Sequence, residues 1–344
     1  MKAKFKLAFR VTSLIWTRLF LVILLGHISS TLFAVEFVDL GTLGGSSSWA
    51  TDVNESDKVI MISSLPGDTD AHIALYSHGH LRDISEEYNL VTTDYVAWAN
   101  AINNRGEIAI NDPIGRAALL NRGHVFEIGL GTYSTILAVN EPGKMVGYWN
   151  INGLPRAFSY YRGEVTLFGP TGPQAISGAS AVNNSGVIVG WSSVSFTIPV
   201  QGWVYQNGVT TLLSPFGHPE CVAKDVNTWG DVVGSYYDGT AFHGFLYENG
   251  TFTSIGTGTN AFAINDSGQI VGEMTFQVPT VAALDGGPIT HAFLYENGTI
   301  TDLNSLIDPS LGWELVEAFA INNRGSIVGV GYLDGNVRAY LIRQ

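Results

Sequence analysis

Carboxylic acids and tryptophans that stand outside any repeated pattern are the residues of this chain best suited to chemistry or binding. Glu314 and Glu317 lie three residues apart beside Trp313, and Glu273 and Trp98 are likewise outside the repeat described below. An exposed indole ring can stack on the face of a sugar while a neighbouring carboxylate accepts its hydroxyl groups. We therefore take these five residues as candidate ligand-binding residues.

The same kind of acid could instead catalyse cleavage of a polysaccharide. Such chemistry needs a general acid and a general base close together, which would require several acids to meet within ~10 Å of one another. The acids that this test concerns are Glu86, Asp94, Glu273, Glu314 and Glu317. Scattered acids beside exposed aromatic rings would favour binding, which is the preferred interpretation, and no residue is assigned a catalytic role.

Sequence motifs for metals and cofactors are missing. The chain has no Gly-x-Ser-x-Gly elbow, no His-Glu-x-x-His, no calcium-binding acidic run and no Walker loop. Residues 256–261 imitate a dinucleotide-binding loop, but that loop needs a following helix to hold the pyrophosphate, and no helical pattern follows. We therefore predict neither a cofactor nor a metal site.

The charge balance excludes some classes of partner. Of 344 residues, 46% are hydrophobic and only 14% are charged, where about a quarter is usual. The formal net charge is −13, and without the five basic residues of segment 1–34 the chain has 12 basic and 30 acidic residues, a net charge of −18. Phosphate groups need basic side chains to neutralise them, so a nucleic-acid partner is disfavoured.

Residues 1–34 are typical of a secretory signal peptide. Scattered Lys and Arg residues precede an apolar run at residues 19–26, which is shorter than the roughly 20 apolar residues of a membrane-spanning helix. We expect cleavage after Ala34 and a periplasmic or secreted protein without a membrane segment; an uncleaved anchor is the alternative. Cys221 is the only cysteine, so it forms no intrachain disulfide and is expected to be a small buried hydrophobic residue.

A repeated pattern governs residues 35–344. Each copy contains a β-branched residue followed by Asn, in most copies a Gly three residues later, and then an apolar run. The Asn residues, called marker asparagines below, are Asn54, Asn103, Asn140, Asn183, Asn227, Asn265 and Asn322. Their spacing of 37–57 residues is near that of propeller blades. The apolar run ends in Gly in the last five copies, whereas the first two have Met61 and Ile110 at that place.

Two predicted hairpins make up each repeat. The Asn-x-x-Gly turn joins two β-rich runs, and a second pair of runs is often joined by Asn-Gly, a two-residue hairpin signal. Such dipeptides stand at residues 207–208, 249–250 and 297–298. Four strands per copy, with small residues on the innermost strand, predict an all-β fold, a seven-bladed β-propeller that residues 35–344 form as a single domain.

The two ends of this domain predict how the ring closes. Residues 338–343 match the third strand of a repeat and no fourth strand follows, whereas residues 36–41 match a fourth strand. The N-terminal strand is therefore expected to pair into the last blade and to remove its free edge.

Three histidines occupy one repeated position, the start of the third strand. His72, His243 and His291 stand there, and other repeats have Arg or Gln. Equivalent positions on different blades lie around a ring, too far apart to share a metal. We therefore expect structural hydrogen bonds from these side chains.

Residues 291–298 read His-Ala-Phe-Leu-Tyr-Glu-Asn-Gly and residues 39–45 read Asp-Leu-Gly-Thr-Leu-Gly-Gly. These segments resemble the HAF repeat family of bacterial extracellular proteins. The resemblance spans nearly all of residues 35–344, is literal in the sixth repeat and is weaker in the first two. It implies secretion and a repeat fold, and it implies no reaction.

Connections at one end of the predicted blades are short, whereas those at the other end vary in length and contain Trp98, Phe196, Phe276 and Trp313. Variable loops on a rigid scaffold commonly carry function. The sequence therefore predicts a secreted, monomeric module that binds a glycan or a protein surface through its variable loops. The alternatives are an extracellular polysaccharide-acting hydrolase or lyase, and a scaffold without a small-molecule site.

Overall fold

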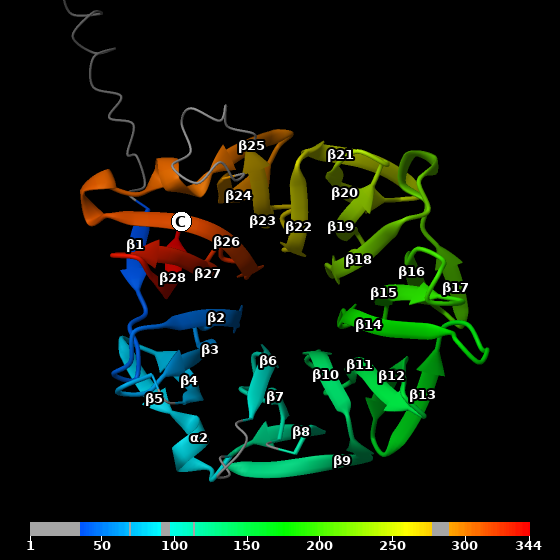
Figure 1. The fold of residues 1–344 in the computed structure, drawn as a ribbon, viewed down its shortest axis with the longest axis horizontal. Helices are drawn as coiled ribbons and strands as arrows, with labels where there is room; N and C mark the ends of the chain where they lie inside the picture. Colours follow the sequence, from blue (N-terminus) through cyan, green and yellow to red (C-terminus); the bar gives the residue numbers. More distant parts are fainter. Residues whose placement is uncertain (1–34, 69, 91–96, 113, 277–288) are drawn as a thin grey trace, which may run out of the picture. The chain divides into compact units, whose positions relative to one another are not determined.

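The computed structural model describes residues 35–68, 70–90, 97–112, 114–276 and 289–344. Within residues 35–344, which form one compact unit, the strands assemble into seven antiparallel four-stranded sheets. The sheets are arranged as the blades of a propeller, each with its first strand nearest the centre (Figure 1). The predicted seven-bladed β-propeller is confirmed, and the predicted signal peptide lies outside the described residues.

The blades are numbered in chain order, and their strands follow one another from the centre outward. Blades 1 to 4 contain β2 (Ser48–Val53), β3 (Val59–Ser64), β4 (Ala71–Ser77) and β5 (His80–Asp83); β6 (Trp98–Ile102), β7 (Ile108–Asn111), β8 (Arg116–Asn121) and β9 (His124–Thr132); β10 (Ser134–Val139), β11 (Met145–Ile151), β12 (Leu154–Tyr161) and β13 (Glu164–Phe168); β14 (Ile176–Val182), β15 (Ile188–Ser193), β16 (Gln201–Gln206) and β17 (Val209–Leu212). Blades 5 to 7 contain β18 (Cys221–Val226), β19 (Val232–Tyr237), β20 (Phe242–Glu248) and β21 (Thr251–Thr257); β22 (Thr259–Ile264), β23 (Ile270–Phe276), β24 (Ile289–Glu296) and β25 (Thr299–Asp302); β26 (Trp313–Ile321), β27 (Ile327–Leu333), β28 (Asn336–Arg343) and β1 (Glu36–Asp39). The short helical segments are α2 (Ile84–Glu87), η1 (Pro215–Gly217), η2 (Leu303–Leu306) and η3 (Pro309–Leu311).

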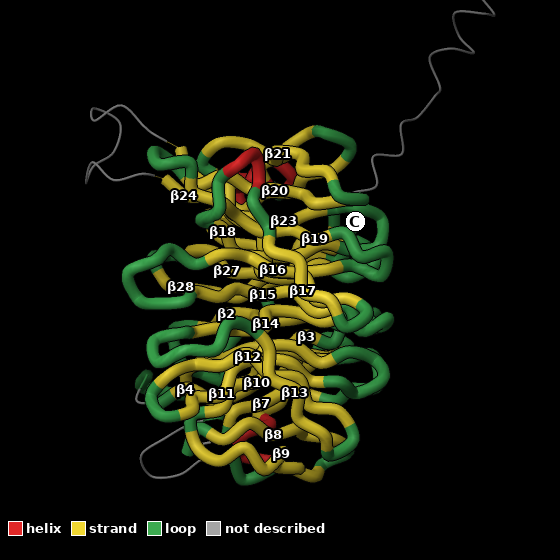
Figure 2. The backbone as a smooth tube through the Cα atoms, turned by 90° about the vertical axis from the view of Figure 1, so that its right-hand side faces the viewer, coloured by secondary structure: helices red, strands yellow, loops and turns green. Residues whose placement is uncertain are grey.

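Loops and turns gather at the two ends of the blades, and the strands run between them (Figure 2). In an antiparallel four-stranded blade, the turn between the first and second strands and the turn between the third and fourth strands share one end. The marker asparagines begin the first of these turns, so we name this end the asparagine face. The other connections form the variable-loop face.

The N-terminal strand completes the last blade, as predicted. β1 pairs antiparallel with β28, with Glu36 opposite Arg343 and Asp39 opposite Tyr340. The Arg338 guanidinium donates two hydrogen bonds to the Asp39 carboxylate, at 3.1 and 3.0 Å. Blade 7 is therefore built from both ends of the propeller domain, which removes an open sheet edge.

The core is divided among the boundaries between neighbouring blades, and each boundary contains one hydrophobic cluster. The residue four positions before each marker asparagine is fully buried there, where the blades converge on the centre. These residues are Ala50, Ala99, Ile136, Ala179, Ala223, Ala261 and Ala318. Six of the seven are alanine, which allows a close approach of the blades, and blade 3 has Ile136 there.

A β-bulge interrupts the first strand of every blade. The pairing register shifts between the residues four and two positions before the marker asparagine, so the residue between them is extra. A bulge re-aims a side chain, and these seven extra residues all keep water-accessible surface on the innermost strands. They therefore face the propeller axis, as do most residues two positions earlier in the strand.

The glycine that ends the apolar run in blades 3 to 7 lies against the first strand. A Cβ atom there would come within 1.8–2.1 Å of a carbonyl oxygen of that strand, so only Gly allows the approach. Each of these glycines faces a buried aromatic residue in the third strand: Gly147 and Phe158, Gly190 and Trp203, Gly234 and Phe245, Gly272 and Phe293, Gly329 and Tyr340. In blades 1 and 2 the corresponding pairs are Met61 with Ala74 and Ile110 with Ala118.

Candidate functional site

The seven marker asparagines form a closed ring of hydrogen bonds around the axis. Each side-chain amide donates to the backbone carbonyl of the marker asparagine in the next blade, at 2.8–3.4 Å, and Asn322 donates to Asn54 to close the ring. The side-chain oxygen of each marker asparagine accepts a hydrogen bond from a backbone N–H of its own turn, as Asn183 does from Ser185 and Val187. The sequence predicted the local turn but not the ring, because the partner carbonyl lies one repeat away.

A polar cavity of about 200 Å³ opens at the asparagine face, lined by the marker asparagines and the residues that follow them. Three of those following residues are acids, Glu55, Glu141 and Asp266, and each accepts a backbone N–H from an adjacent blade. The acids at this end therefore link blades to one another. We assign the asparagine face a structural role.

The histidines at the start of the third strands make the expected structural hydrogen bonds. The Nδ1 atoms of His72 and His291 lie 2.6 Å from carboxylate oxygens of Asp83 and Asp302, which end the fourth strands of their blades. His243 reaches Asp238, in the turn before it, at 2.8 Å. Within the described residues, no group of three or more His, Cys, Asp or Glu side chains is arranged to hold a metal ion.

The lone cysteine is buried, as expected, but it is also a hydrogen-bond acceptor. The Cys221 Sγ atom accepts the Gly202 N–H at 3.3 Å. Ser134 and Ser177 accept the equivalent N–H of the preceding blade through their hydroxyl groups. Burial raises the pKa of the Cys221 thiol to about 11, so this side chain is an inert contact between blades 4 and 5.

Two of the predicted site residues, Glu273 and Glu317, lie on contacting strands of neighbouring blades, β23 of blade 6 and β26 of blade 7. Burial raises the pKa of Glu317, and the charge of Glu273 raises it further. Glu273 accepts a hydrogen bond from the Asn260 side-chain amide at 2.7 Å, whereas no hydrogen bond from a described residue lowers the pKa of Glu317. The sequence singled out these two acids but could not show that their strands contact each other.

Three bulged residues in blades 5 to 7 complete this cluster, and the sequence analysis missed them. The Phe262 and Phe319 rings stack with centroids 5.9 Å apart, and the Lys224 ammonium lies 5.7 Å from the Phe262 ring centre. Partial loss of hydration lowers the pKa of the Lys224 ammonium, although the residue keeps water-accessible surface. The negative charge of Glu273 opposes that shift. We name Lys224, Asn260, Phe262, Glu273, Glu317 and Phe319 the axial cluster.

Trp98 lies in the inner strand of blade 2, across the ring from the axial cluster (Figure 1). Its side chain is 49% exposed and packs against Trp49 of blade 1, with 5.9 Å between ring centres. Trp49, Trp98, Asn260 and Glu317 all lie five residues before a marker asparagine. They therefore share one level along the axis, nearer to the variable-loop face than the bulged residues.

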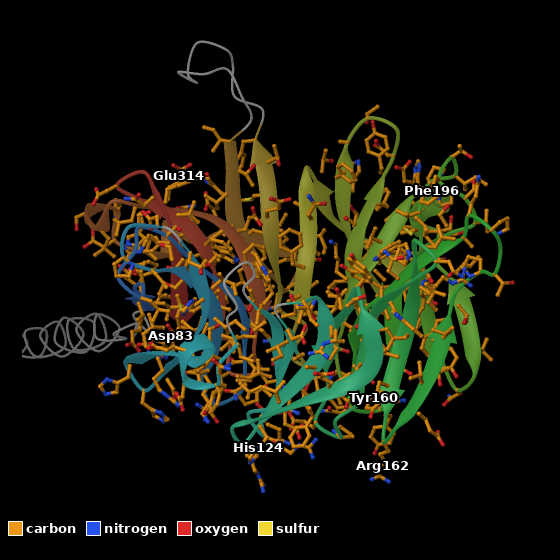
Figure 3. All side chains as sticks on the ribbon, turned by 60° about the horizontal axis from the view of Figure 1, so that its bottom comes forward. Asp83, His124, Tyr160, Arg162, Phe196 and Glu314 are labelled. Atoms are coloured by element: carbon orange, nitrogen blue, oxygen red, sulfur yellow. The ribbon has the colours of Figure 1, made fainter. Side chains whose placement is uncertain are left out.

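Trp313 and Glu314 start β26 but have different surroundings. The Trp313 indole packs edge-on against Phe37 of the N-terminal strand, with 5.1 Å between ring centres, and joins the cluster between blades 6 and 7. Glu314 is exposed, and its Oε1 atom lies 4.0 Å from His291 Nε2. Figure 3 shows Glu314 and the loop residue Phe196 at the upper rim of the blades, away from His124 at the start of β9 and Arg162 in a turn at the opposite end.

The acids that would form a catalytic cluster are therefore distributed over several places. Glu273 and Glu317 lie on the contacting strands β23 and β26, and Glu314 lies beside His291. Glu86 lines a separate cavity of about 360 Å³ in blade 1, and Asp94 lies outside the described residues. The described acids of this set therefore do not form one cluster.

These features define a closed seven-bladed β-propeller with a charged and aromatic cluster on its axis. Solved structures with a similar fold include an oligogalacturonate lyase in complex with manganese, which is 9% identical over 90% of both chains with a TM-score of 0.56. The β-propeller domain of the Trilobed protease from Pyrococcus furiosus, described as having an open Velcro topology, is 10% identical over 86% of this chain and 93% of its own, with a TM-score of 0.54. TolB from Acinetobacter baumannii is 11% identical, and the match covers 88% of this chain but only 65% of TolB, with a TM-score of 0.43.

Similarity at these identities shows the fold alone. No protein-family model matches the chain, and no curated protein matches it. None of the helices in the described part of the chain has the length and apolar character needed to cross a membrane.

Proposed function

We propose that this protein is an extracytoplasmic module that binds a glycan or a protein surface at its variable-loop face. The observation that carries the proposal is Trp98, half exposed on an innermost strand and packed against Trp49 of the neighbouring blade. Blade geometry does not demand an indole there, since Thr135 and Val222 occupy the same position in blades 3 and 5. A rigid, exposed indole offers a flat apolar surface at low entropic cost.

A polysaccharide-acting hydrolase or lyase is the second candidate, and the axial cluster is the observation that favours it. The pKa of Glu317 is raised and that of Lys224 is lowered. Groups shifted in these directions can serve as general acid and general base nearer to neutral pH. The likeness to an oligogalacturonate lyase contributes the fold and no reaction. A scaffold without a small-molecule site is the third candidate.

The experiment that tests the proposal is a screen of the purified protein against immobilised polysaccharides, scoring both retention and turnover. Trp98→Ala is expected to abolish retention while the melting temperature stays within a few degrees of the wild type. Trp229→Ala is the matched control, because Trp229 is 74% exposed but lies in a turn of the asparagine face. Unchanged retention in Trp98→Ala contradicts the proposal, and turnover that Glu317→Gln abolishes favours the enzyme.

Export across a membrane is part of the same proposal, supported by residues 1–34 and by the likeness to the HAF repeat family. Replacing Leu21, Ile23 and Leu24 with Asp should leave full-length protein in the cytoplasm, because a charged segment cannot serve as the apolar region of a signal peptide. Cell fractionation and N-terminal sequencing measure this. Wild-type protein found soluble in the cytoplasm with Met1 intact would contradict export.

A further inference from the structure

The inner strands of the propeller carry an excess of negative charge. In the first two strands of the seven blades, the charged residues are one lysine and five acids: Lys224, Asp52, Asp225, Glu273, Glu314 and Glu317. All of them except Asp52 lie in blades 5 to 7, which are consecutive in the ring (Figure 1). Within the axial cluster itself, the two carboxylates of Glu273 and Glu317 outnumber the one ammonium of Lys224, so a charged ligand that reached it would meet a net negative site.

An ammonium group of the chain itself, that of Lys224, lies in the axial cluster. Lys224 places its ammonium over the face of Phe262, which in turn stacks on Phe319. A cation over an aromatic face gains about 0.5–2 kcal/mol. The chain's own side chain therefore shows which chemical group this aromatic pair accepts.

Among the described residues, the Glu317 carboxylate is the acid of the cluster that no hydrogen-bond donor reaches, since Tyr340 bonds only its backbone carbonyl. Glu273, by contrast, accepts the Asn260 amide at 2.7 Å. Glu317 also keeps water-accessible surface, so a ligand atom can reach it. A ligand ammonium would supply both the missing hydrogen bond and the missing positive charge.

We infer that the axial cluster binds the free ammonium group of an amino sugar, which pairs with Glu317 and Glu273 beside the Phe262–Phe319 stack. This inference rests on the proposed binding function and narrows its ligand to a cationic glycan. Trp98 lies at the same level along the axis as Glu317. A sugar chain that enters from the variable-loop face would therefore contact the Trp98 indole and the Glu317 carboxylate at the same distance from that face. The net charge of −18 on residues 35–344 attracts such a ligand from a distance.

The test compares chitosan oligomers, which carry free amino groups, with fully N-acetylated chitin oligomers of the same length. Calorimetric titration of the purified protein at low salt should give at least tenfold tighter binding of the chitosan oligomer, and added salt should weaken it. Glu317→Gln should weaken that binding roughly tenfold, the usual effect of losing a charged hydrogen bond. Lys224→Gln should tighten it several-fold, because it removes the ammonium that competes for the same site.

Glu164→Gln is the control for charge alone, because Glu164 is exposed in β13, the outermost strand of blade 3. It should leave binding unchanged, and circular dichroism and melting curves should show that every variant is folded. Opposite effects at Glu317 and Lys224 are not expected from a general loss of structure.

Several outcomes would overturn the inference. Equal affinity for both oligomers, or retention of neutral glycans without chitosan, refutes the cationic ligand while the proposed binding function stands. Binding of oligogalacturonate that Lys224→Gln abolishes shows an anion site instead. Binding of poly-L-lysine without chitosan identifies a cationic peptide as the partner, and binding of none of these probes counts against both proposals.

Discussion

Blades 1 and 2 and blades 3 to 7 fill the centre of the sheet in two different ways. The later blades place glycine against the first strand and an aromatic ring opposite it, as in Gly272 and Phe293. The first two blades place a large aliphatic side chain there and alanine opposite it, as in Met61 and Ala74. Both kinds of pair are buried, and both kinds of blade keep the bulge and the marker asparagine.

The difference teaches that the repeat specifies a filled volume rather than a residue type. A core tolerates the exchange of hydrophobic residues when their total volume is kept. Here a glycine–phenylalanine pair in one blade is replaced by a methionine–alanine pair in another. The hydrogen bonds around the axis are not exchanged in this way, because an asparagine side chain supplies the donor to the next blade in all seven blades.

The most severe test of this comparison concerns blade 7, the one later blade whose strands come from both ends of the domain. Deleting residues 35–41 removes β1, the Phe37 contact with Trp313 and the Asp39 pair with Arg338. We expect aggregation or loss of cooperative folding, because β28 and the apolar cluster behind it become exposed. An unchanged melting temperature would show that blade 7 is stable with three strands and that ring closure is dispensable.

The core pairs themselves are tested by a double-mutant cycle in blade 1. Met61→Gly should destabilise by about 3–5 kcal/mol through the cavity it leaves, and Ala74→Phe by about 1–3 kcal/mol through overpacking. Because the two changes together recreate the pair of the later blades, the double variant should recover most of the loss. Urea unfolding measures this, and additive losses would mean that the two kinds of core are not interchangeable.

The reverse exchange in blade 6 should fail, which sharpens the comparison. A Cβ at Gly272 would lie 1.9 Å from the Asn260 carbonyl oxygen and 3.0 Å from the Phe293 ring. Phe293→Ala removes the second contact but not the first, because the first involves the backbone. Gly272→Met with Phe293→Ala should therefore stay strongly destabilised.

Two tryptophans near the variable-loop face, one in each kind of blade, should respond differently to truncation. Trp313→Ala is expected to cost about 2–4 kcal/mol, since the indole is partly buried against Phe37 in the core between blades 6 and 7. Trp98→Ala should cost less than about 1 kcal/mol, because half of its surface already faces water. Equal losses would mean that Trp98 also acts as a structural plug and would weaken the proposed binding site.

The sequence alone predicted the fold well because the same pattern of strands and turns recurs in seven repeats. Marker asparagines, Asn-Gly turns and the unmatched strands at the two ends all involve short-range patterns. Asn249-Gly250 and Asn297-Gly298, for example, have positive φ at both residues, as a two-residue hairpin of this kind requires. Ring closure followed from counting strands and needed no knowledge of contacts.

The axial cluster could be predicted only in part. Glu273 and Glu317 attracted attention as acids outside the repeat, but Lys224, Phe262 and Phe319 lie within its most regular segment. One signal in the sequence could have found them. All three stand three residues before a marker asparagine, and the residue type at that position varies among Thr, Asn, Leu, Ser, Lys and Phe. Only the bulge, which is a feature of strand pairing, explains why this variable position faces the axis.

Asp52 and Asp225 provide the smallest and last test, because they occupy the same position in a blade of each kind. Both lie two residues before a marker asparagine, where the other blades have Ala. Each carboxylate accepts the N–H of its own next residue and an N–H of the following blade, Ile102 for Asp52 and Ile264 for Asp225. Burial raises the pKa of Asp52 to about 7, and burial also raises that of Asp225.

A raised native pKa means that the folded protein binds these protons more tightly than the unfolded chain does. The free energy of unfolding should therefore fall as the pH rises from about 4 to about 7. Asp52→Asn keeps one acceptor oxygen, for Ile102, and cannot ionise, so it should flatten this fall. The lost acceptor for the Val53 N–H offsets part of the gain, so the stabilisation at pH 8 should stay below about 1–2 kcal/mol. Asp225→Asn should act in the same direction. Urea unfolding across this pH range measures both effects. If the free energy of unfolding of Asp52→Asn falls with pH as steeply as that of the wild type, the pKa of Asp52 is not raised in the folded protein.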